Sequence, residues 1–231
     1  NGRKSFNSFL ESLSVILSRS FLLFFRSKKL FLSYIVLNLL YVAIAVFMFF
    51  DIQPGQSEIQ DRTGCIFYIN TCCVMTTVQI SAFVFALESN VLKKELMQGQ
   101  YTPLSYFLGL TLPPVLPSLM IMVPAYLAIF FLCNLNAAEN DQVIKFTLLI
   151  VLTILPSEAL GHCVGIVYEK STAIGVVLPG FLMPQMLVNG FFYNLRSPGW
   201  LAYPLQSASI IRYSFEGLMV NEFEGATCEG C

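Results

Sequence analysis

Glu158 and His162 are the residues of this 231-residue chain whose types and spacing could do proton chemistry. They lie four positions apart in an apolar stretch, so a helix would place both side chains on one face. Two interpretations stay open: a proton relay, or a Glu–His hydrogen bond that satisfies both groups, which is the simpler one. His162 is the chain's one histidine, and the patterns GxxxxGK[ST], HExxH and GxSxG are absent. We therefore expect no catalytic residue in this chain.

The elements that position these residues must be membrane helices, because the composition excludes a water-soluble protein. Hydrophobic residues make up 56% of the chain and charged residues only 12%, and phenylalanine occurs 21 times. Soluble domains average about 25% charged residues. The mean hydropathy is +0.69, the wealth of aromatic residues excludes a disordered chain, and a formal net charge of −1 offers nucleic acid no basic face. The sequence predicts an all-α integral membrane protein.

Five stretches are apolar and long enough to cross a bilayer as helices, for which about 20 residues suffice. The uncharged window between Arg196 and Arg212 is too short for a crossing, so we interpret 196–231 as an extracellular segment with a re-entrant or interfacial part. The predicted spans are 30–50, 63–87, 104–132, 146–167 and 171–195.

The positive charges set the predicted orientation. With the N-terminus in the cytosol, nine of the 13 Lys and Arg residues lie in inner segments and four in outer ones, as the positive-inside rule requires. Residues 1–29 repeat apolar side chains at helical spacing and end in a basic cluster. They predict an amphipathic helix on the cytoplasmic surface of a plasma or intracellular membrane, with packing on a soluble neighbour as the alternative.

Proline is frequent inside the predicted spans. Each proline removes a backbone donor and bends its helix, and in a membrane such breaks persist only where protein or a wet cavity satisfies the freed carbonyls. This pattern is typical of transporters, and a kinked structural bundle is the alternative. The seven prolines concerned are Pro113, Pro114, Pro117, Pro124, Pro156, Pro179 and Pro184.

Cys228 and Cys231 form a CxxC pair in the predicted extracellular segment. Disulfides persist outside the cell, so we favour disulfide bonds, with partners beyond this sequence, over half of a zinc site that lacks a second pair. We expect no metal site. The other five cysteines lie in or beside the spans, where thiols act as small apolar groups.

The segment 88–99 is a short, charged link between the second and third predicted spans. It is helix-prone, and Gly99 stands where a helix C-terminal cap is expected. Glu88 and Glu95 share one helix face, whereas Lys93 and Lys94 point elsewhere. A rigid helix here could transmit movement from a cytosolic partner; a solvated loop is the alternative.

Several short motifs in a fixed order carry a resemblance to a known family. The chain resembles the membrane domain of ABC transporters of the G subfamily, the white-type pigment, sterol and multidrug exporters. The matching motifs are Leu17-Ser18-Arg19, Phe25-Arg26, Arg62-Thr63-Gly64, Lys94-Glu95-x-x-x-Gly99-x-Tyr101, Gly190-Phe191-Phe192, Trp200 and Arg212-Tyr213 through Asn221-Glu222-Phe223.

The resemblance implies partners and a larger protein. In this family an ATPase domain, which binds ATP and Mg, precedes the membrane domain of the same polypeptide, two halves form a homo- or heterodimer, and a sixth span follows. The chain, which starts with Asn1, is then expected to be a fragment. The resemblance makes the link a coupling helix that faces the ATPases, with Glu88, Lys93, Lys94, Glu95, Gly99 and Tyr101 as its residues.

The resemblance also implies a substrate slit between the second and fifth spans around the dimer axis. Phe191 and Phe192 stand where some members carry a leucine pair, so they would form a hydrophobic plug above the slit. Ordinary helix packing is the alternative for each slit position. Those positions are Cys72, Cys73, Thr76, Gln79, Met183, Met186 and Asn189.

The predicted function is that of the permease domain of an ATP-driven exporter, which moves lipids, sterols or other hydrophobic or amphipathic small molecules. An apolar slit with few polar groups suits such a cargo. Two alternatives stay open. One is a proton-coupled secondary transporter that uses Glu158 and His162, and the other is a receptor or scaffold that transports nothing.

Overall fold

The computed structural model describes residues 11, 13–19, 21–22, 28–52, 59–97, 103–135, 140–168, 171–192 and 202–223. Every regular element within these ranges is an α-helix. The all-α prediction is therefore confirmed for the part of the chain that the structure describes.

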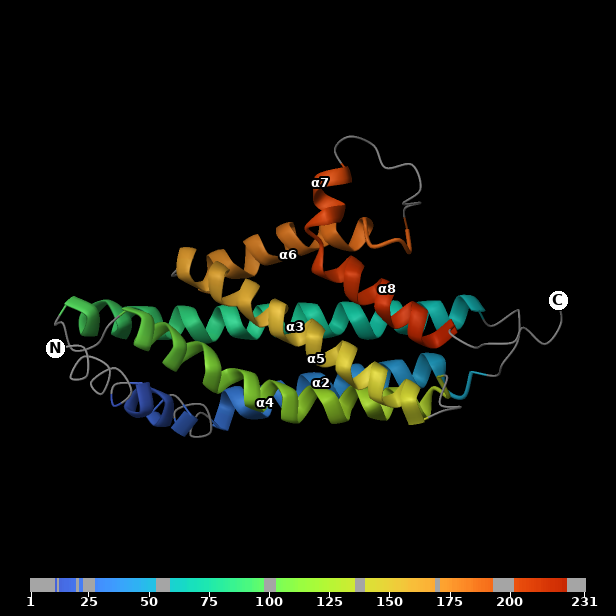
Figure 1. Cartoon of the computed structure of the whole chain (residues 1–231), viewed down its shortest axis with the longest axis horizontal. Helices are drawn as coiled ribbons and strands as arrows, with labels where there is room; N and C mark the ends of the chain where they lie inside the picture. The colour runs from blue at the N-terminus through green and yellow to red at the C-terminus, as the bar shows by residue number, and fades with distance from the viewer. Residues whose placement is uncertain are drawn as a thin grey trace.

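Among the described residues, four helices are long and apolar enough to cross a membrane. They are α2 (Lys28–Phe49), α3 (Ile59–Met97), α4 (Pro103–Leu132) and α5 (Asn140–Val167). Three shorter helices follow: α6 (Ser171–Leu187), α7 (Ala202–Ser207) and α8 (Ile210–Phe223). Together they form a multi-pass bundle in which α3 lies in the middle, α2 and α4 lie on one side of it, and α6 and α8 lie on the other (Figure 1).

The helix α3 is longer than the second predicted span. It has 39 residues and continues without a break through the charged link as far as Met97. Charge ends an apolar run but does not end a helix, because Lys and Glu are good helix formers. The span and residues 88–97 of the predicted coupling segment are therefore one continuous helix, and residues 98 and 99 lie outside the described part.

The helix α6 ends at Leu187 and does not continue toward residue 195 as the apolar run suggested. At the turn that follows, the Asn189 side chain accepts a hydrogen bond from the Phe191 amide at 2.9 Å, and Gly190 adopts a φ of 101°. Asn and Gly favour such turns over helix. With 17 residues, α6 is about 25 Å long, shorter than a bilayer core.

The closest helix packing is between α3 and α5 and depends on two glycines one turn apart. A Cβ at Gly161 would lie 2.5 Å from the Val78 carbonyl oxygen, and one at Gly165 would lie 2.7 Å from that of Ala82. Small residues four apart let two membrane helices approach until their backbones touch. The Gly-x-x-x-Gly motif of α5 therefore allows the close packing of this helix against α3.

Two groups of buried side chains flank α3. One joins α3 to α2, α4, α5 and α8 around Ile69, Tyr126 and Ile150, and the other joins α3 to α6 and α8 around Val78 and Leu178. The outward faces of the bundle remain apolar. Large exposed hydrophobic side chains there include Leu39, Phe47, Met120, Ile144 and Val176, as expected of surfaces that face lipid or another apolar partner.

The residues of the predicted N-terminal helix that the structure describes are helical over 13–19. Ile16 is buried against α4, where a Cβ at Gly109 would come within 2.5 Å of its Cγ2 atom. Val15 on the same segment is exposed. This segment therefore has a buried and an exposed side; residues 1–10 of the predicted domain 1–29 lie outside the described part.

Candidate functional site

The predicted slit positions lie on two different flanks of α3. Cys72 and Thr76 are buried and interact with Tyr41 of α2, and Cys73 is fully buried in the group around Ile69. Within this chain, Cys72, Cys73 and Thr76 therefore do not lie next to the predicted slit residues of α6.

On the other flank, Met186 of α6 packs partly buried against the group around Val78. Met183 and Gln79 are exposed, so neither side chain is committed to packing within this chain. Asn189 is buried, but its oxygen is used by the turn that follows α6.

The two predicted plug residues belong to a cluster of four phenylalanines. Phe191 stacks on Phe67 of α3, with ring centroids 4.7 Å apart and planes at 15°. Phe192 meets the same ring edge-on at 5.3 Å, and Phe215 of α8 does so at 6.2 Å. Stacked and edge-on pairs of this kind add to the stability gained by burial.

This cluster, which we call the aromatic cluster (Phe67, Phe191, Phe192 and Phe215), joins three elements at one place. The turn at Asn189 and Gly190 directs Phe191 back toward α3, so aromatic rings link the end of α6 to α3 and α8. Sequence reasoning identified Phe191 and Phe192 but missed Phe67 and Phe215. No spacing rule relates these two residues, which come from separate helices.

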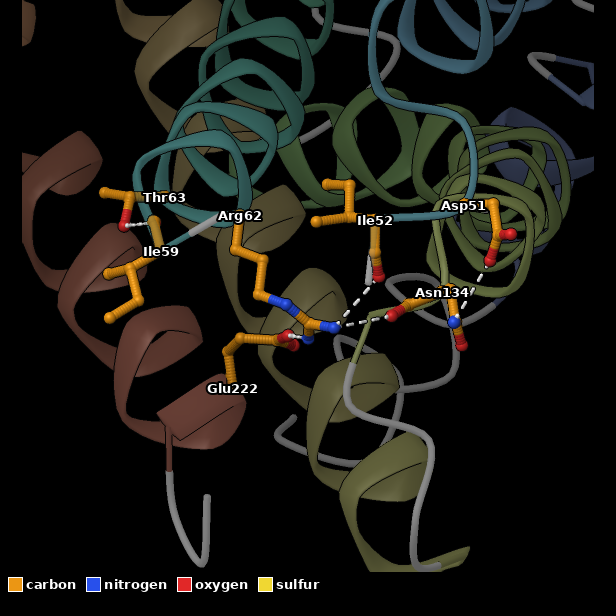
Figure 2. A network of polar contacts seen from close by, with 7 residues as sticks. All are labelled: Asp51, Ile52, Ile59, Arg62, Thr63, Asn134 and Glu222. Carbon is orange, nitrogen blue, oxygen red and sulfur yellow. Dashed lines mark hydrogen bonds and ion pairs between the residues drawn. The ribbon is translucent and has the colours of Figure 1, made fainter. Parts of the chain in front are cut away.

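A polar network lies at the end of the bundle where α3 begins (Figure 2). The Arg62 guanidinium donates through Nη1 to Glu222 Oε1 of α8 at 2.5 Å. Through Nη2 it donates to the main-chain oxygens of Ile52 at 3.1 Å and Asn134 at 3.3 Å. One side chain thus connects α3, α8 and the segments that follow α2 and α4. Planar guanidinium groups with several donors suit this role.

The two segments that Arg62 holds are built alike. Asp51 follows α2 with a φ of 50°, and Asn134 follows α4 with a φ of 54°, the left-handed conformation that Asn and Asp tolerate best among non-glycine residues. Asn134 Nδ2 donates to Asp51 Oδ1 at 3.2 Å, and the Asp51 and Ile52 amides donate to the Leu132 and Cys133 carbonyls. The paired helix ends satisfy each other's backbone groups.

A second polar link joins the beginning of α8 to the first third of α3. Asn70 Nδ2 donates to the Ile211 carbonyl at 2.7 Å, and its Oδ1 accepts from the Ser214 hydroxyl at 2.6 Å. All these groups are buried, where a satisfied hydrogen bond is worth more than one in water. The helix α8 is therefore fixed to α3 at both ends, by Asn70 and by Arg62.

Glu158 and His162 both lie buried on α5, but their side chains have different partners. The His162 ring donates through Nδ1 to the main-chain oxygen of Glu158 at 2.7 Å, and it meets Phe85 edge-on. The Glu158 carboxylate instead accepts from the Ser118 hydroxyl of α4 at 2.5 Å. The hydrogen bond between these residues therefore runs from the His162 ring to the main chain of Glu158, and the two side chains have different partners within the described part of the chain.

Several predicted positions cannot be placed. Glu88, Lys93, Lys94 and Glu95 lie on the last turns of α3, but their side chains are outside the described part. The backbones of Gly99, Tyr101, Cys228 and Cys231 are outside it as well. Within the described ranges, no group of three or more His, Cys, Asp and Glu residues is placed so that it could bind a metal ion.

Comparison with known proteins gives one family model and several relatives. The model described as ABC-2 type transporter matches residues 11–223. A probable ATP-dependent permease of Saccharomyces cerevisiae is 29% identical over 93% of this chain and 20% of its own length. The broad substrate specificity ATP-binding cassette transporter ABCG2 of Sus scrofa is 30% identical over 96% of this chain and 34% of its own.

A plant relative extends this similarity to a third kingdom. ABC transporter G family member 5 of Arabidopsis thaliana is 26% identical over 94% of this chain and 33% of its own length. The chain therefore spans between a fifth and about a third of the length of these relatives.

Proposed function

Because this chain belongs to the ABC-2 type transporter family and is homologous to ABCG transporters, we propose that it is the membrane domain of an ATP-driven exporter. The ATPase is expected on the part of the polypeptide that the chain does not span, with ATP and Mg bound there. A second copy or a related half-transporter completes the passage. The chain itself does no bond chemistry.

The cargo we propose is a hydrophobic or amphipathic small molecule, with lipids and sterols as the leading class. Support comes from the predicted slit positions, among which Cys72, Cys73, Met183 and Met186 carry no charge and little polarity. It also comes from the relatives, one of which is named for broad substrate specificity. An apolar surface binds such a molecule through the large area of contact that it buries. The few polar groups on this surface then fix the orientation of the bound molecule.

The aromatic cluster is the observation that best supports a gate for this passage. Phe191 and Phe192 follow the end of α6 and contact α3 and α8 through their rings. These ring contacts separate without breaking a hydrogen bond or an ion pair. A shift of α6 against α3 that separates the rings would open the cluster and let an apolar molecule pass.

The experiment is transport by the full-length protein in proteoliposomes, with a fluorescent phospholipid, a labelled sterol and an apolar dye as cargoes. We expect ATP-dependent movement of at least one cargo and stimulation of ATP hydrolysis by it. No stimulation by any of these compounds would overturn the cargo class. Movement that survives removal of ATP and depends on a pH gradient would favour the proton-coupled alternative.

The role of the cluster is tested by Phe191→Ala combined with Phe192→Ala. The gate predicts altered flux in this double variant while ATP hydrolysis without cargo persists. Phe47→Ala is the matched control, because Phe47 is the most exposed phenylalanine of α2. Equal flux in all three proteins would contradict the gate and leave the exporter assignment standing.

A further inference from the structure

The Glu158 carboxyl is buried in the bundle with only part of its hydrogen-bonding capacity used. The residue is 3% exposed. Its Oε1 accepts from the Ser118 hydroxyl at 2.5 Å, and its Oε2 has no hydrogen-bond partner within the described residues. A carboxylate can accept about four hydrogen bonds, so this one is far from satisfied if it carries a full charge.

The groups that surround the carboxyl come from every neighbouring helix and none of those described is a cation. Tyr34 of α2 lies within electrostatic reach of Ser118, of Glu158 and of Cys73 on α3. Tyr34 is 2% exposed, and its hydroxyl also has no hydrogen-bond partner among described residues. On α5 itself, His162 directs Nδ1 to the main chain.

Ser118 of α4 brings its hydroxyl to this carboxyl. The same hydroxyl lies 2.9 Å from the Pro114 carbonyl oxygen, so its one proton is shared between the two acceptors. Pro117 has no N–H, so the Pro113 carbonyl one turn earlier lacks its helical donor. Hydroxyl, carboxylate and carbonyl oxygens are the ligands that small hard cations take up, and broken membrane helices with freed carbonyls often supply them.

A buried carboxylate without a positive partner is expensive, by several kcal/mol even after the protein relaxes around it. We propose that Glu158, with Tyr34 and Ser118, forms a binding site for one small monovalent cation, either a proton or Na⁺. The cation supplies the missing positive charge and occupies the unpartnered oxygen. Because the ligands come from α2, α4 and α5, its binding depends on these three helices staying together.

Occupancy of this site therefore changes when the helices move apart. Separation of α4 from α5 breaks the Ser118–Glu158 hydrogen bond, admits water to the carboxyl and lets the cation leave. The bundle thus couples a bound cation to its own opening. Cation binding at Glu158 requires neither cargo nor ATP, so it can be tested independently of the proposed exporter.

Infrared difference spectroscopy of the full-length protein, wild type minus Glu158→Gln, identifies the cation. The C=O stretch of a neutral carboxyl, present in wild type and lost in the variant, is expected if the site holds a proton. Carboxylate stretches that shift when choline is replaced by Na⁺ are expected if the site holds Na⁺. Carboxylate stretches that respond to neither Na⁺ nor pH would overturn the proposal.

Labelling with a hydrophobic carbodiimide, followed by peptide mass spectrometry, places the effect on Glu158. A neutral carboxyl adds its proton and oxygen across a C=N bond of the reagent, and the acyl group then migrates to nitrogen as a stable acylurea. We expect labelling of Glu158 and loss of this label in Glu158→Gln. Glu216→Gln is the matched control, because Glu216 is exposed on α8, and it should leave labelling of Glu158 unchanged.

Tyr34→Phe separates the two cations while it keeps the shape of the ring. If Na⁺ is the ligand, Na⁺ protects Glu158 of the wild type from the carbodiimide, and this protection is lost in Tyr34→Phe. If a proton is the ligand, Na⁺ protects neither protein and labelling falls as pH rises. Equal labelling of Glu158 and Glu216 at every pH would show that water reaches both carboxyls, and would overturn the site.

Discussion

Arg62 and Glu222, which are 160 residues apart in the sequence, form a salt bridge in which Nη1 lies 2.5 Å from Oε1. The Arg62 side chain is 14% exposed and that of Glu222 is 3% exposed. Because Arg62 also holds the main chain after α2 and α4, this pair fixes α8 to three other elements. It closes one end of the bundle (Figure 2).

Removal of Arg62 should destabilise the protein more than removal of the whole pair. Arg62→Met removes the Arg62 counter-charge from a carboxylate that is 3% exposed, and loss of one partner of a buried ion pair typically costs about 3–5 kcal/mol. Arg62→Met combined with Glu222→Gln also removes the buried negative charge and should recover much of this loss. The measurement is thermal unfolding of the purified full-length protein together with its yield at the membrane.

Lys145→Gln is the control for this cycle. Lys145 pairs with Asp141 at 2.9 Å, but both side chains are largely exposed, and exposed pairs contribute at most about 1 kcal/mol. Its melting temperature should therefore stay near that of the wild type. A double variant no more stable than Arg62→Met would show that the contacts to the main chain, and not the ion pair, carry the effect.

The glycine motif of α5 gives a second test of packing. Gly161→Ala places a methyl group against the Val78 carbonyl, and overpacking of this kind costs about 1–3 kcal/mol. Gly175→Ala on α6 is the matched control, since a Cβ there meets nothing within 4 Å and alanine favours helix over glycine. We expect a lower melting temperature for the first and an equal or higher one for the second. Equal melting temperatures would show that α3 and α5 can move apart freely.

The apolar helices were readable from the sequence because charge and hydropathy mark where a chain enters and leaves the membrane. The range predicted for the third span, 104–132, nearly coincides with α4 (Pro103–Leu132). Hydropathy does not mark helix ends, so α3 and α5 extend beyond their predicted spans into polar residues. Nor does it register the backbone turn at Gly190, which ends α6 at Leu187.

The contacts between helices were not predicted from the sequence. The Gly161-x-x-x-Gly165 spacing fits a known packing motif of membrane helices, but it was not identified before the structure, and it does not reveal the partner face on α3. Arg62 and Glu222 each stand in a recognised motif, yet nothing in one-dimensional spacing joins them. Side chains on separate helices meet by tertiary packing, and for the same reason the aromatic cluster and the Ser118–Glu158 bond could not be anticipated.

Two buried thiols give a test of where α3 lies against the end of α4. Cys65 of α3 and Cys133, which follows α4, are both fully buried and belong to the same group of packed side chains around Ile69. Air oxidation catalysed by copper–phenanthroline should join them, as the two thiols give two electrons and two protons to oxygen. Unreduced peptide mapping by mass spectrometry detects the bond. Cys163, which is exposed on α5, should react with a maleimide instead; free thiols at both Cys65 and Cys133 after oxidation would contradict the packing.

The continuity of α3 gives the last prediction, which rests on the proposed function. The helix extends from Arg62 at one end of the bundle to Glu95 at the other without interruption. A displacement of its charged end is therefore transmitted along the helix to the part that crosses the membrane. Asn90→Pro kinks the helix between the two, because proline removes a backbone hydrogen bond and clashes with the preceding turn. We expect this variant to keep ATP hydrolysis but to lose transport in proteoliposomes, whereas Asn90→Ala, which preserves the helix, keeps both. Glu95→Ala should likewise lower transport per ATP hydrolysed, and full transport by Asn90→Pro would show that movement reaches the bundle by another route.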